Sequence, residues 1–327
     1  MKGFQIKLKE QFSERMKILL GSEFDEFAKS LEGRPFTSIR VNELKISPEE
    51  LVKRLEEKGW KIRRPFSEHK EIIIIEGKYL DTNIIPLEPG EIGRTLEHLL
   101  GYYYVQEISS MLPVIALNPL ENERVLDLCA SPGSKTTQIA SLMKNTGLII
   151  ANEVNLGRIK ILSSNLERCG AGNVIITRQD GAILCDKLLK EGFMFDKILV
   201  DAPCSGEGTL RTNPKTAEMW NYNGIKKMSF IQKRLLVSAM KVLKVGGEIV
   251  YSTCTYAPEE DEEVIDFVLE KFDSIKIESI TLPVKCRQGI TKWDDKDYNK
   301  ELAKSCRIYP HVANTEGFFI AKMRKTK

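Results

Sequence analysis

Two cysteines stand in unusual sequence surroundings. Cys204 follows Asp201 and Pro203 and precedes a glycine-rich stretch, and Cys254 lies in a Ser-Thr-Cys-Thr run about fifty residues later. The common fate of an intracellular cysteine is burial as a small hydrophobic residue. Packing alone does not need a proline beside the thiol and an aspartate three residues before it. Because a thiolate is a good nucleophile, this context favours a reactive pair.

A second group of candidate residues surrounds a tight turn. Residues 127–138 read DLCASPGSKTTQ, and the Pro132-Gly133 turn leads into an expected helix whose first backbone N–H groups are free. Such a loop suits a nucleotide-like ligand. It is neither G-x-G-x-x-G nor G-x-x-x-x-G-K-[ST], which disfavours a dinucleotide dehydrogenase or a P-loop ATPase.

Two acids follow the next expected strands. Glu153 could accept hydrogen bonds from both hydroxyls of a ribose, and Asp180 could bind an adenine amino group. An acid after a strand is as readily a solvated loop residue, so neither acid identifies a site by itself.

All these candidates fall at the ends of expected strands. From about residue 95, short apolar runs alternate with helical segments, which implies a parallel sheet covered on both faces. Ligands bind such sheets beyond the carboxyl ends of the strands. A right-handed crossover makes the strands before Cys204 and Cys254 neighbours. The expected strands are 124–128, 148–152, 174–177, 197–200 and 248–252, and the helices run through 139–142, over 156–168 and over about 224–243.

The first ninety residues do not show this regular alternation of strands and helices. Apolar spacing predicts a helix over residues 1 to about 30, and Ser47-Pro48 begins another helix that Gly59 ends. Lys and Arg number 17 and Asp and Glu 16 in residues 1–90, so no basic block marks a nucleic-acid platform. The proline- and glycine-rich stretch 85–93 indicates a junction between domains 1–92 and 93–327. Strands are expected over 37–41, 60–62 and 71–76.

Composition limits the class of protein. The chain has 327 residues, 42% hydrophobic and 29% charged, which fits a globular protein of about two domains. We expect a cytoplasmic protein, because no apolar run could cross a bilayer and no secretory signal is visible. A net charge of +3 neither requires nor excludes nucleic acid. Seven cysteines without a C-x-x-C pair, and only three histidines, predict reduced thiols and no metal site.

In the two cysteine motifs and in the turn at residues 127–138, the chain resembles the Sun/Fmu family of RNA cytosine-5 methyltransferases, most closely the archaeal-type members that act on transfer RNA. Ser134 departs from the family, which usually has a second glycine there. The resemblance implies a Rossmann-like class I methyltransferase domain, an α/β fold with a mostly parallel seven-stranded sheet and helices on both faces, after a small α+β N-terminal domain. It rests on DLCASPGSKTTQ (127–138), DAPCSGEGTLR (201–211), YSTCTY (251–256), RIYPHVANTEGFFIAKM (307–323), YVQEISSMLP (104–113) and SIRVNELKISPEELVKRLEEKGW (38–60).

The resemblance also implies a mechanism. Carbon 5 of cytosine is a weak nucleophile, so a thiolate must first add to carbon 6 before S-adenosylmethionine can methylate carbon 5. Cys254 would be that nucleophile, and Cys204 would help to break the covalent adduct. Asp201 would hold N3 or the exocyclic amine of the flipped base, and Lys135 would touch the base or the cofactor.

Cofactor contacts carry over from the family in the same way. The loop backbone would surround the methionine part, Glu153 the ribose and Asp180 the adenine, while Asp201 would face the methionine amine and Arg158 would support Glu153. The implied S-adenosylmethionine residues are Cys129, Ala130, Ser131, Pro132, Gly133, Ser134, Lys135, Glu153, Arg158, Asp180 and Asp201.

Three alternatives stay open. Ribosomal RNA is the second candidate substrate after transfer RNA. A DNA cytosine-5 methyltransferase would use Cys204 as the nucleophile, but it usually carries a target-recognition insert that we do not find. A non-catalytic RNA-binding or assembly factor would be expected to have lost Asp201, Cys204 or Cys254, and all three are present. No protein partner or membrane contact is predicted.

Overall fold

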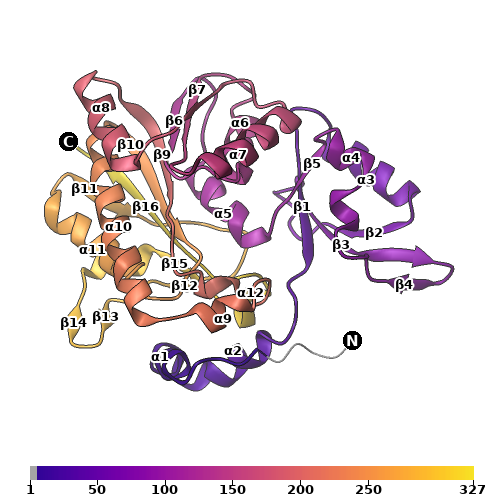
Figure 1. Ribbon diagram of the computed structural model, residues 1–327, viewed down its shortest axis with the longest axis horizontal. Helices are drawn as coiled ribbons and strands as arrows, with labels where there is room; N and C mark the ends of the chain where they lie inside the picture. The colour runs from indigo at the N-terminus through magenta and orange to yellow at the C-terminus, as the bar shows by residue number, and fades with distance from the viewer. Residues whose placement is uncertain (1–5) are drawn as a thin grey trace.

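The computed structural model describes residues 6–327, which form a small sheet unit beside a larger, helix-covered sheet (Figure 1). The small sheet has the order β2-β3-β1-β5, with β4 paired to β3, and all its pairings are antiparallel. The elements up to this sheet's last strand are α1 (Glu10–Leu20), η1 (Gly21–Glu23), α2 (Phe24–Ser30), β1 (Thr37–Val41), α3 (Pro48–Glu57), β2 (Trp60–Arg63), β3 (Ile72–Leu80), β4 (Asn83–Ile85), η2 (Glu91–Gly93), α4 (Leu96–Leu99) and β5 (Tyr103–Val105).

The rest of the chain forms the larger sheet and its helices. The first half of this part comprises α5 (Ile108–Leu117), β6 (Arg124–Asp127), α6 (Ser134–Leu142), β7 (Leu148–Asn152), α7 (Leu156–Cys169), β8 (Val174–Thr177), α8 (Gly181–Lys190) and β9 (Phe195–Asp201). The second half comprises η3 (Glu207–Thr209), α9 (Lys215–Met219), α10 (Tyr222–Lys241), β10 (Leu243–Thr253), α11 (Glu262–Lys271), β11 (Ile275–Glu278), β12 (Arg287–Gln288), β13 (Lys292–Trp293), β14 (Lys296–Asp297), η4 (Lys300–Lys304), β15 (Cys306–Ile308), α12 (Pro310–Ala313) and β16 (Phe318–Lys325).

The larger sheet is mostly parallel, as predicted. Its order is β12-β15-β16-β10-β9-β6-β7-β8, and β11 also pairs with β16. The strands from β10 to β8 are parallel, whereas β16 runs antiparallel to β10. The α/β fold class is therefore confirmed. The number of strands is nine rather than the predicted seven, because the short strands β15 and β12 extend the edge beyond β16.

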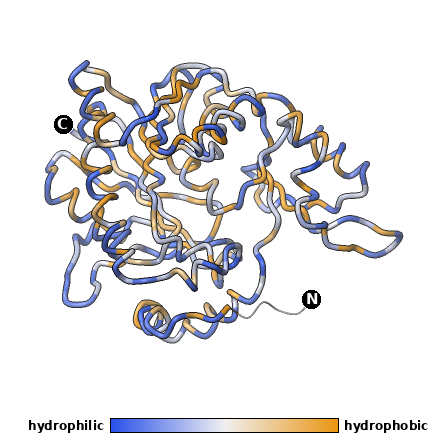
Figure 2. The backbone as a smooth tube through the Cα atoms, viewed as in Figure 1, coloured by the Kyte–Doolittle hydropathy of each residue, from blue (hydrophilic) through white to orange (hydrophobic). Residues whose placement is uncertain are grey.

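Helices cover both faces of this sheet because its strands are apolar on both sides. Side chains alternate along a strand, so Val125 and Leu126 of β6 point to opposite faces. Leu126 packs in the core with α8, α10 and α11, and Val125 packs with α5 and α6. Figure 2 shows the hydrophobic strands running through the middle of the molecule. Within residues 6–327, no helix has the length and apolar character needed to cross a membrane.

The helix expected over residues 1 to about 30 is two helices in the structure. A 3-10 turn beginning at Gly21, whose φ is 56°, separates α1 from α2, and the part of this prediction that covers residues 1–5 lies outside the described residues. These helices pack against the chain near Trp220 and Tyr256: Phe12 contacts Trp220, and Phe27 contacts Tyr256.

The last strand of the small sheet also lies beyond the boundary expected at residue 92, because β5 pairs with β1. The division into domains 1–92 and 93–327 stays a prediction. The Ser47 cap is present, since its hydroxyl accepts a hydrogen bond from the backbone amide of Glu50, at 3.2 Å.

Candidate active site

The two cysteines of the sequence motifs meet at one edge of the larger sheet. Strands β9 and β10 are parallel neighbours, with Asp201 opposite Ser252, so the loops after them leave the sheet side by side. Cys204 Sγ lies 3.1 Å from Cys254 Sγ. The loops are joined further by the Gly208 amide, which donates to the Cys254 carbonyl at 2.8 Å. The structure therefore brings the predicted reactive pair into direct contact.

The surroundings of Cys204 keep its thiol protonated. The hydrogen bond with Cys254 and then burial raise the pKa of Cys204 well above its ordinary value. Cys204 is therefore a protonated thiol at neutral pH, and a thiol can donate a hydrogen bond. Its sulfur lies in hydrogen-bond contact with the sulfur of Cys254, and either sulfur can be the donor. The contact suits a pair in which one sulfur attacks and the other holds a proton.

Two residues that the sequence did not single out hold Cys204 from both sides. Gln232 Nε2, on α10, donates to the Pro203 carbonyl at 2.8 Å and to Glu260 Oε2 at 2.9 Å. The same Glu260 oxygen accepts from the Ser205 amide at 2.9 Å. Burial raises the pKa of Glu260 to about 7. Gln232 and Glu260 thus fix the peptide groups before and after Cys204.

A partly buried ion pair lies at the end of β9, three residues before Cys204. Lys135 Nζ, in the first turn of α6, lies 2.7 Å from Asp201 Oδ2 and donates to Ser110 Oγ at 3.0 Å. The other oxygen of Asp201 accepts from Ser252 Oγ at 2.7 Å. Lys135 thus orients Asp201, and the sequence had left open whether Lys135 faces the base or the cofactor.

The cofactor-type loop connects β6 to α6. Gly133 has a φ of 102°, and a Cβ there would lie 3.0 Å from Leu162 Cδ1, so the turn favours glycine. No side chain caps α6, which leaves its first amides available to an anionic group. Asp127, at the end of β6, accepts from Thr136 Oγ1 through Oδ2. Its buried Oδ1 has no partner among residues 6–327, and burial raises the pKa of this carboxyl to about 7.

Arg158 joins this loop to Glu153. Its Nη2 donates to the Ser131 carbonyl at 2.6 Å, and its Nη1 lies 3.2 Å from Glu153 Oε2. Ser131 Oγ in turn donates to the Arg158 carbonyl at 3.0 Å. Arg158 and Glu153 are brought together with the loop, as the resemblance implied.

The rest of the loop is tied to its neighbours. The Ala130 amide donates to the Asn152 carbonyl at 2.9 Å, and the Pro132 carbonyl accepts from Asn165 Nδ2 at 2.9 Å. Burial, with the nearby carboxylates of Asp127, Asp201 and Glu153, raises the pKa of Cys129 well above its ordinary value. Cys129 is therefore a protonated thiol within the loop.

Both carboxylate oxygens of Asp180 form contacts within the protein, which the sequence did not indicate. Its Oδ1 caps α8 by accepting from the amides of Ala182 and Ile183, and its Oδ2 lies 2.6 Å from Arg234 Nη2. Burial opposes ionisation, but Arg234 and the α8 amides prevail and lower the pKa of Asp180. Both carboxylate oxygens thus have partners within the protein, so an adenine amino group would have to share them.

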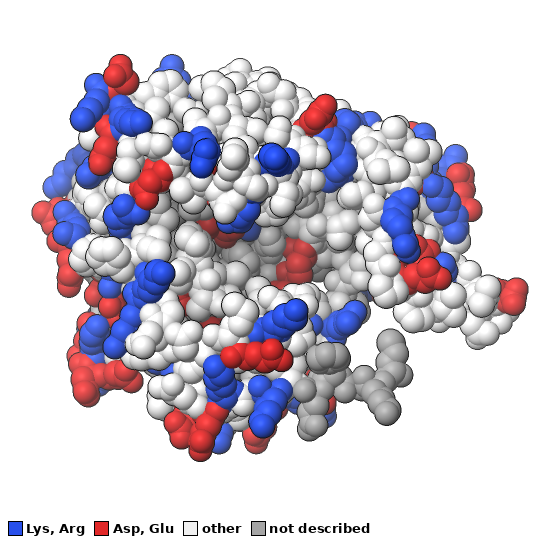
Figure 3. Space-filling view, in the orientation of Figure 1, with Lys and Arg blue, Asp and Glu red and all other residues white. Residues whose placement is uncertain are grey.

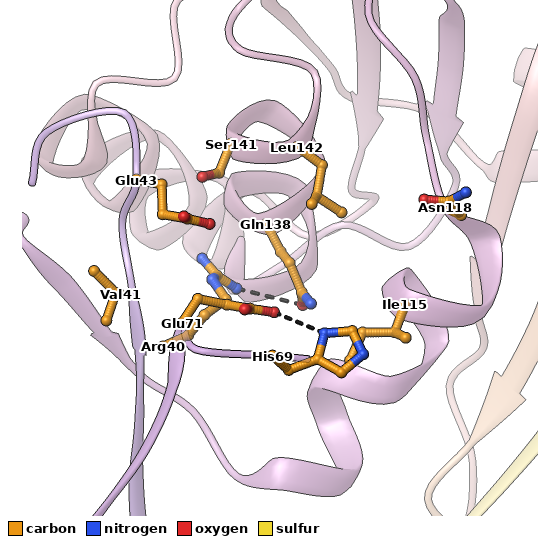
Figure 4. A pocket seen from close by; sticks show the side chains of 10 residues that line it. All are labelled: Arg40, Val41, Glu43, His69, Glu71, Ile115, Asn118, Gln138, Ser141 and Leu142. Carbon is orange, nitrogen blue, oxygen red and sulfur yellow. Dashed lines mark hydrogen bonds and ion pairs between the residues drawn. The ribbon is translucent and has the colours of Figure 1, made fainter. Parts of the chain in front are cut away.

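The small sheet reaches the loop through one buried cation. Arg40 of β1 is only 2% exposed, and it donates to the Ser134 carbonyl at 2.7 Å and to Thr137 Oγ1 at 2.8 Å. Figure 4 shows it beside a cavity of about 70 Å³, where it also reaches Gln138. Burial lowers the pKa of Arg40 to about 10, so it remains charged at neutral pH. Nothing in the local sequence marks this residue, because its partners lie about a hundred positions away.

The face drawn in Figure 3 has a hollow near its centre. Acidic side chains lie inside the hollow, and Lys and Arg side chains stand around it. Throughout the described residues, His, Cys, Asp and Glu side chains nowhere gather in a group of three that could hold a metal ion.

The chain matches two family models that together cover almost all of it. Residues 114–324 match the model for the 16S rRNA methyltransferase RsmB/F, and residues 8–108 match that for the N-terminal domain of 16S rRNA methyltransferase RsmF.

Curated relatives include both transfer RNA and ribosomal RNA enzymes. The chain is 41% identical over 290 residues to the tRNA (cytosine(49)-C(5))-methyltransferase of Pyrococcus abyssi, covering 89% of this chain and 88% of that protein. It is 38% identical over 327 residues to the ribosomal RNA small subunit methyltransferase F of Vibrio parahaemolyticus, covering 98% of this chain. It spans only 64% of that longer relative.

Two solved structures share the whole architecture. A methyltransferase homologue from Pyrococcus horikoshii has a TM-score of 0.83 and 36% identity, covering 98% of this chain and 96% of that one. The structure of NSun6 from Pyrococcus horikoshii with SFG has a TM-score of 0.80 and 27% identity, covering 99% and 100%.

Proposed function

This chain belongs to the RsmB/F family of S-adenosylmethionine-dependent RNA cytosine-5 methyltransferases, and we propose that it methylates transfer RNA through a covalent adduct between Cys254 and carbon 6 of the target cytosine. The contact between Cys204 and Cys254, at the end of paired strands and beside Asp201, carries this proposal. Cytosine-5 chemistry needs one sulfur that attacks and a second group that handles protons, and this arrangement provides both.

The proposed reaction begins with the thiolate of Cys254. An isolated thiol has a pKa of about 8.5 and is only a few per cent ionised at pH 7, so a neighbouring donor that stabilises the thiolate raises the reactive fraction. Cys204 is that donor, because its own raised pKa keeps its proton in place. Addition of Cys254 Sγ to carbon 6 moves electron density to carbon 5, and Asp201 stabilises the ring at N3 or the exocyclic amine.

S-adenosylmethionine supplies the methyl group that carbon 5 accepts. The free amides at the start of α6 suit its carboxylate, and the unpartnered Asp127 Oδ1 is a buried acceptor in the same loop. Glu153, held by Arg158, would accept from the ribose hydroxyls. The residues present therefore fit the cofactor.

Release of the product completes the proposed cycle. The proton on carbon 5 passes to Cys204 Sγ as that thiol gives its own proton to the departing Cys254 Sγ. The electrons of the carbon–hydrogen bond restore the double bond between carbon 5 and carbon 6, and the bond between Cys254 Sγ and carbon 6 breaks with its electron pair returning to the sulfur. Cys204 assists these last steps because its sulfur lies beside the sulfur that departs. Loss of Cys204 should therefore stop the reaction after methylation.

Transfer RNA is proposed as the substrate because a transfer RNA enzyme is 41% identical over nearly all of both chains. Ribosomal RNA is the second candidate. The ribosomal relative, at 38% identity, matches 98% of this chain, and the matching family models are those of ribosomal RNA enzymes. A cytoplasmic location stays a prediction.

The test is methyl transfer from labelled S-adenosylmethionine to total transfer RNA, ribosomal RNA and duplex DNA. Wild type is compared with Cys254→Ala and Cys204→Ala, and the control is Cys286→Ala, which removes an exposed thiol that contacts Cys306 and not the proposed pair. We expect 5-methylcytosine in transfer RNA, none with Cys254→Ala although cofactor affinity is kept, and a denaturant-resistant protein–RNA adduct with Cys204→Ala.

Other results would change the assignment. Label in ribosomal RNA alone would replace the substrate and keep the chemistry. Full activity in Cys254→Ala would exclude it as the nucleophile, and label confined to DNA and lost only with Cys204→Ala would reverse the two cysteine roles. No label in any nucleic acid would favour a non-catalytic binding factor.

A further inference from the structure

A second cavity lies where the small sheet unit meets the catalytic unit. Its volume is about 260 Å³. Phe36, Arg63 and Phe66 line it from the small sheet's side, and Lys285, Asn314 and Thr315 line it from the other. We call it the Phe36 cavity. None of the residues proposed for the cofactor or the reaction lines it.

One aromatic side chain of the cavity, that of Phe36, is open to solvent. Phe36 is 41% exposed, and the guanidinium of Arg63 lies 4.7 Å from the centre of its ring. Ordinary folding favours burying so large an apolar ring. An accessible aromatic ring with a cation beside it is how proteins stack unpaired nucleobases, because every base has a flat π-face.

The charges around the cavity suit an RNA backbone. Lys285 lines the cavity and is exposed, and Arg34, two residues before Phe36 in the chain, is exposed as well. Neither forms an ion pair with another of the residues 6–327. Arg63, by contrast, is held by Glu76 at 2.7 Å, which fixes it beside the ring. Free cations on both sides of a stacking surface could neutralise the phosphates of a bound strand.

The cavity is connected to the thiol pair through its wall. Arg211 donates to Asn314 Oδ1 at 2.9 Å and to the Thr315 carbonyl at 3.0 Å. In the same loop the Gly317 amide donates to the Gly208 carbonyl at 2.9 Å, and the Gly208 amide donates to the Cys254 carbonyl at 2.8 Å. The cavity wall and the loop of the nucleophile are thus parts of one hydrogen-bonded structure.

We propose that the Phe36 cavity binds an unpaired base of the RNA substrate, other than the cytosine that reacts, by stacking it on Phe36. The inference rests on the proposed function, because it places a second contact for the same RNA. A base held here and a cytosine at Cys254 would anchor one single-stranded segment at two points. Duplex DNA offers no unpaired base for this cavity.

The test compares Phe36→Ala and Phe36→Trp with Phe230→Ala, which removes an aromatic ring that is 71% exposed on α10. The probe is the RNA fraction that wild type labels, and the readouts are the dissociation constant for that RNA, its KM in methyl transfer and the affinity for S-adenosylmethionine. Phe36→Ala should weaken RNA binding roughly fivefold to a hundredfold, the range of one stacked base, while cofactor affinity stays the same. Phe36→Trp should bind as wild type does, and so should Phe230→Ala.

Lys285→Ala gives an independent measurement should the Phe36 variants fold poorly. It should lower the slope of log affinity against log salt by about one, whereas Phe36→Ala should leave that slope unchanged. Wild-type RNA affinity in folded Phe36→Ala, or an unchanged salt slope in Lys285→Ala, would overturn the proposal. Wild type that labels no RNA would instead overturn the proposed function, so the two failures are distinguishable.

Discussion

Cys204 depends on two neighbours for its position. Gln232 and Glu260 hold the peptide groups on either side of it, and neither touches the sulfur in the contacts described above. They are therefore positioning residues. Their effect on the reaction should appear in the step that uses Cys204, which in the proposed cycle is release of the product.

Gln232→Ala should slow product release. It removes the donor to the Pro203 carbonyl, so Cys204 moves relative to Cys254, and misplacement of a reacting group can lower turnover by tenfold to a hundredfold. The measurement is rapid-quench methyl transfer, with denaturing gels to detect the adduct. The first turnover should stay fast while adduct accumulates. Gln288→Ala, an exposed glutamine on β12, is the control, and equal slowing of both phases would mean that Gln232 acts only on stability.

Glu260→Gln should change the pH dependence of stability. Burial raises the pKa of Glu260 to about 7, above the value near 4.3 of an unfolded glutamate. Between those pH values the folded state holds more protons, so Glu260 makes the wild type lose stability as pH rises from about 4 to 7, with no further loss above pH 7.

The measurement for Glu260→Gln is urea unfolding at pH 5, 6, 7 and 8. The variant keeps an acceptor for Ser205 and Gln232 but cannot ionise, so its stability relative to wild type should rise by up to about 1.4 kcal/mol per pH unit in that window. A difference between the two proteins that is independent of pH would contradict this account.

At the scale of elements, the start of α6 decides how the cofactor loop is shaped. The chain turns at Gly133 with a positive φ and passes close to Leu162 of α7. No side chain caps the first amides of α6. Helix α7 also supplies Arg158, so two helices together set the loop's geometry.

Gly133→Ala should weaken cofactor binding. A Cβ at this position adds about 1 kcal/mol or more of backbone strain and must displace Leu162 Cδ1, 3.0 Å away. We expect S-adenosylmethionine affinity, measured by calorimetry, to fall about tenfold. Gly192→Ala has the same kind of strain, with a φ of 65° and open space around it, but lies far along the chain at the end of α8. It should lower stability slightly and leave cofactor affinity unchanged; an equal loss in both variants would show that only strain matters.

At the scale of the whole molecule, the small sheet contributes to the active site through Arg40. The cation crosses from β1 to α6 and donates to the carbonyl of Ser134 in the cofactor loop. Helices α1 and α2 make a second link, because they pack against Tyr256, two residues after Cys254. The two units are therefore coupled on both sides of the site.

Arg40→Ala should lower both stability and cofactor affinity. It removes the donor to Thr137 Oγ1 and one of the donors to the Ser134 carbonyl, which Thr137 Oγ1 still reaches at 3.0 Å. Leaving a buried acceptor such as Thr137 Oγ1 without its partner costs about 1–3 kcal/mol. Unfolding by urea and cofactor titration measure the two effects. Arg54→Ala, a half-exposed arginine on α3, should change neither by more than about 0.5 kcal/mol. Unchanged cofactor affinity in a folded Arg40→Ala protein would contradict the link between β1 and the loop.

The parallel sheet and the contact between the two cysteines could both be predicted from the order of residues along the chain. Alternating strands and helices have one favoured handedness, so the strands before Cys204 and Cys254 had to be neighbours. The turn at Gly133 and the cap at Ser47 were predictable for a similar reason, because each depends on residues a few positions apart. Contiguous motifs were also sufficient to identify the family.

The side chains that surround those motifs could not be predicted without knowing how the chain folds. The partners of Pro203, Ser134 and Asp180 are Gln232, Arg40 and Arg234, which lie 29 to 94 positions away along the chain. The packing of α1 and α2 near Tyr256, and the short strands that extend the sheet to nine, are equally non-local. Local pattern records which face of an element is apolar, but not which distant element will cover it, since that depends on the packing of the whole chain.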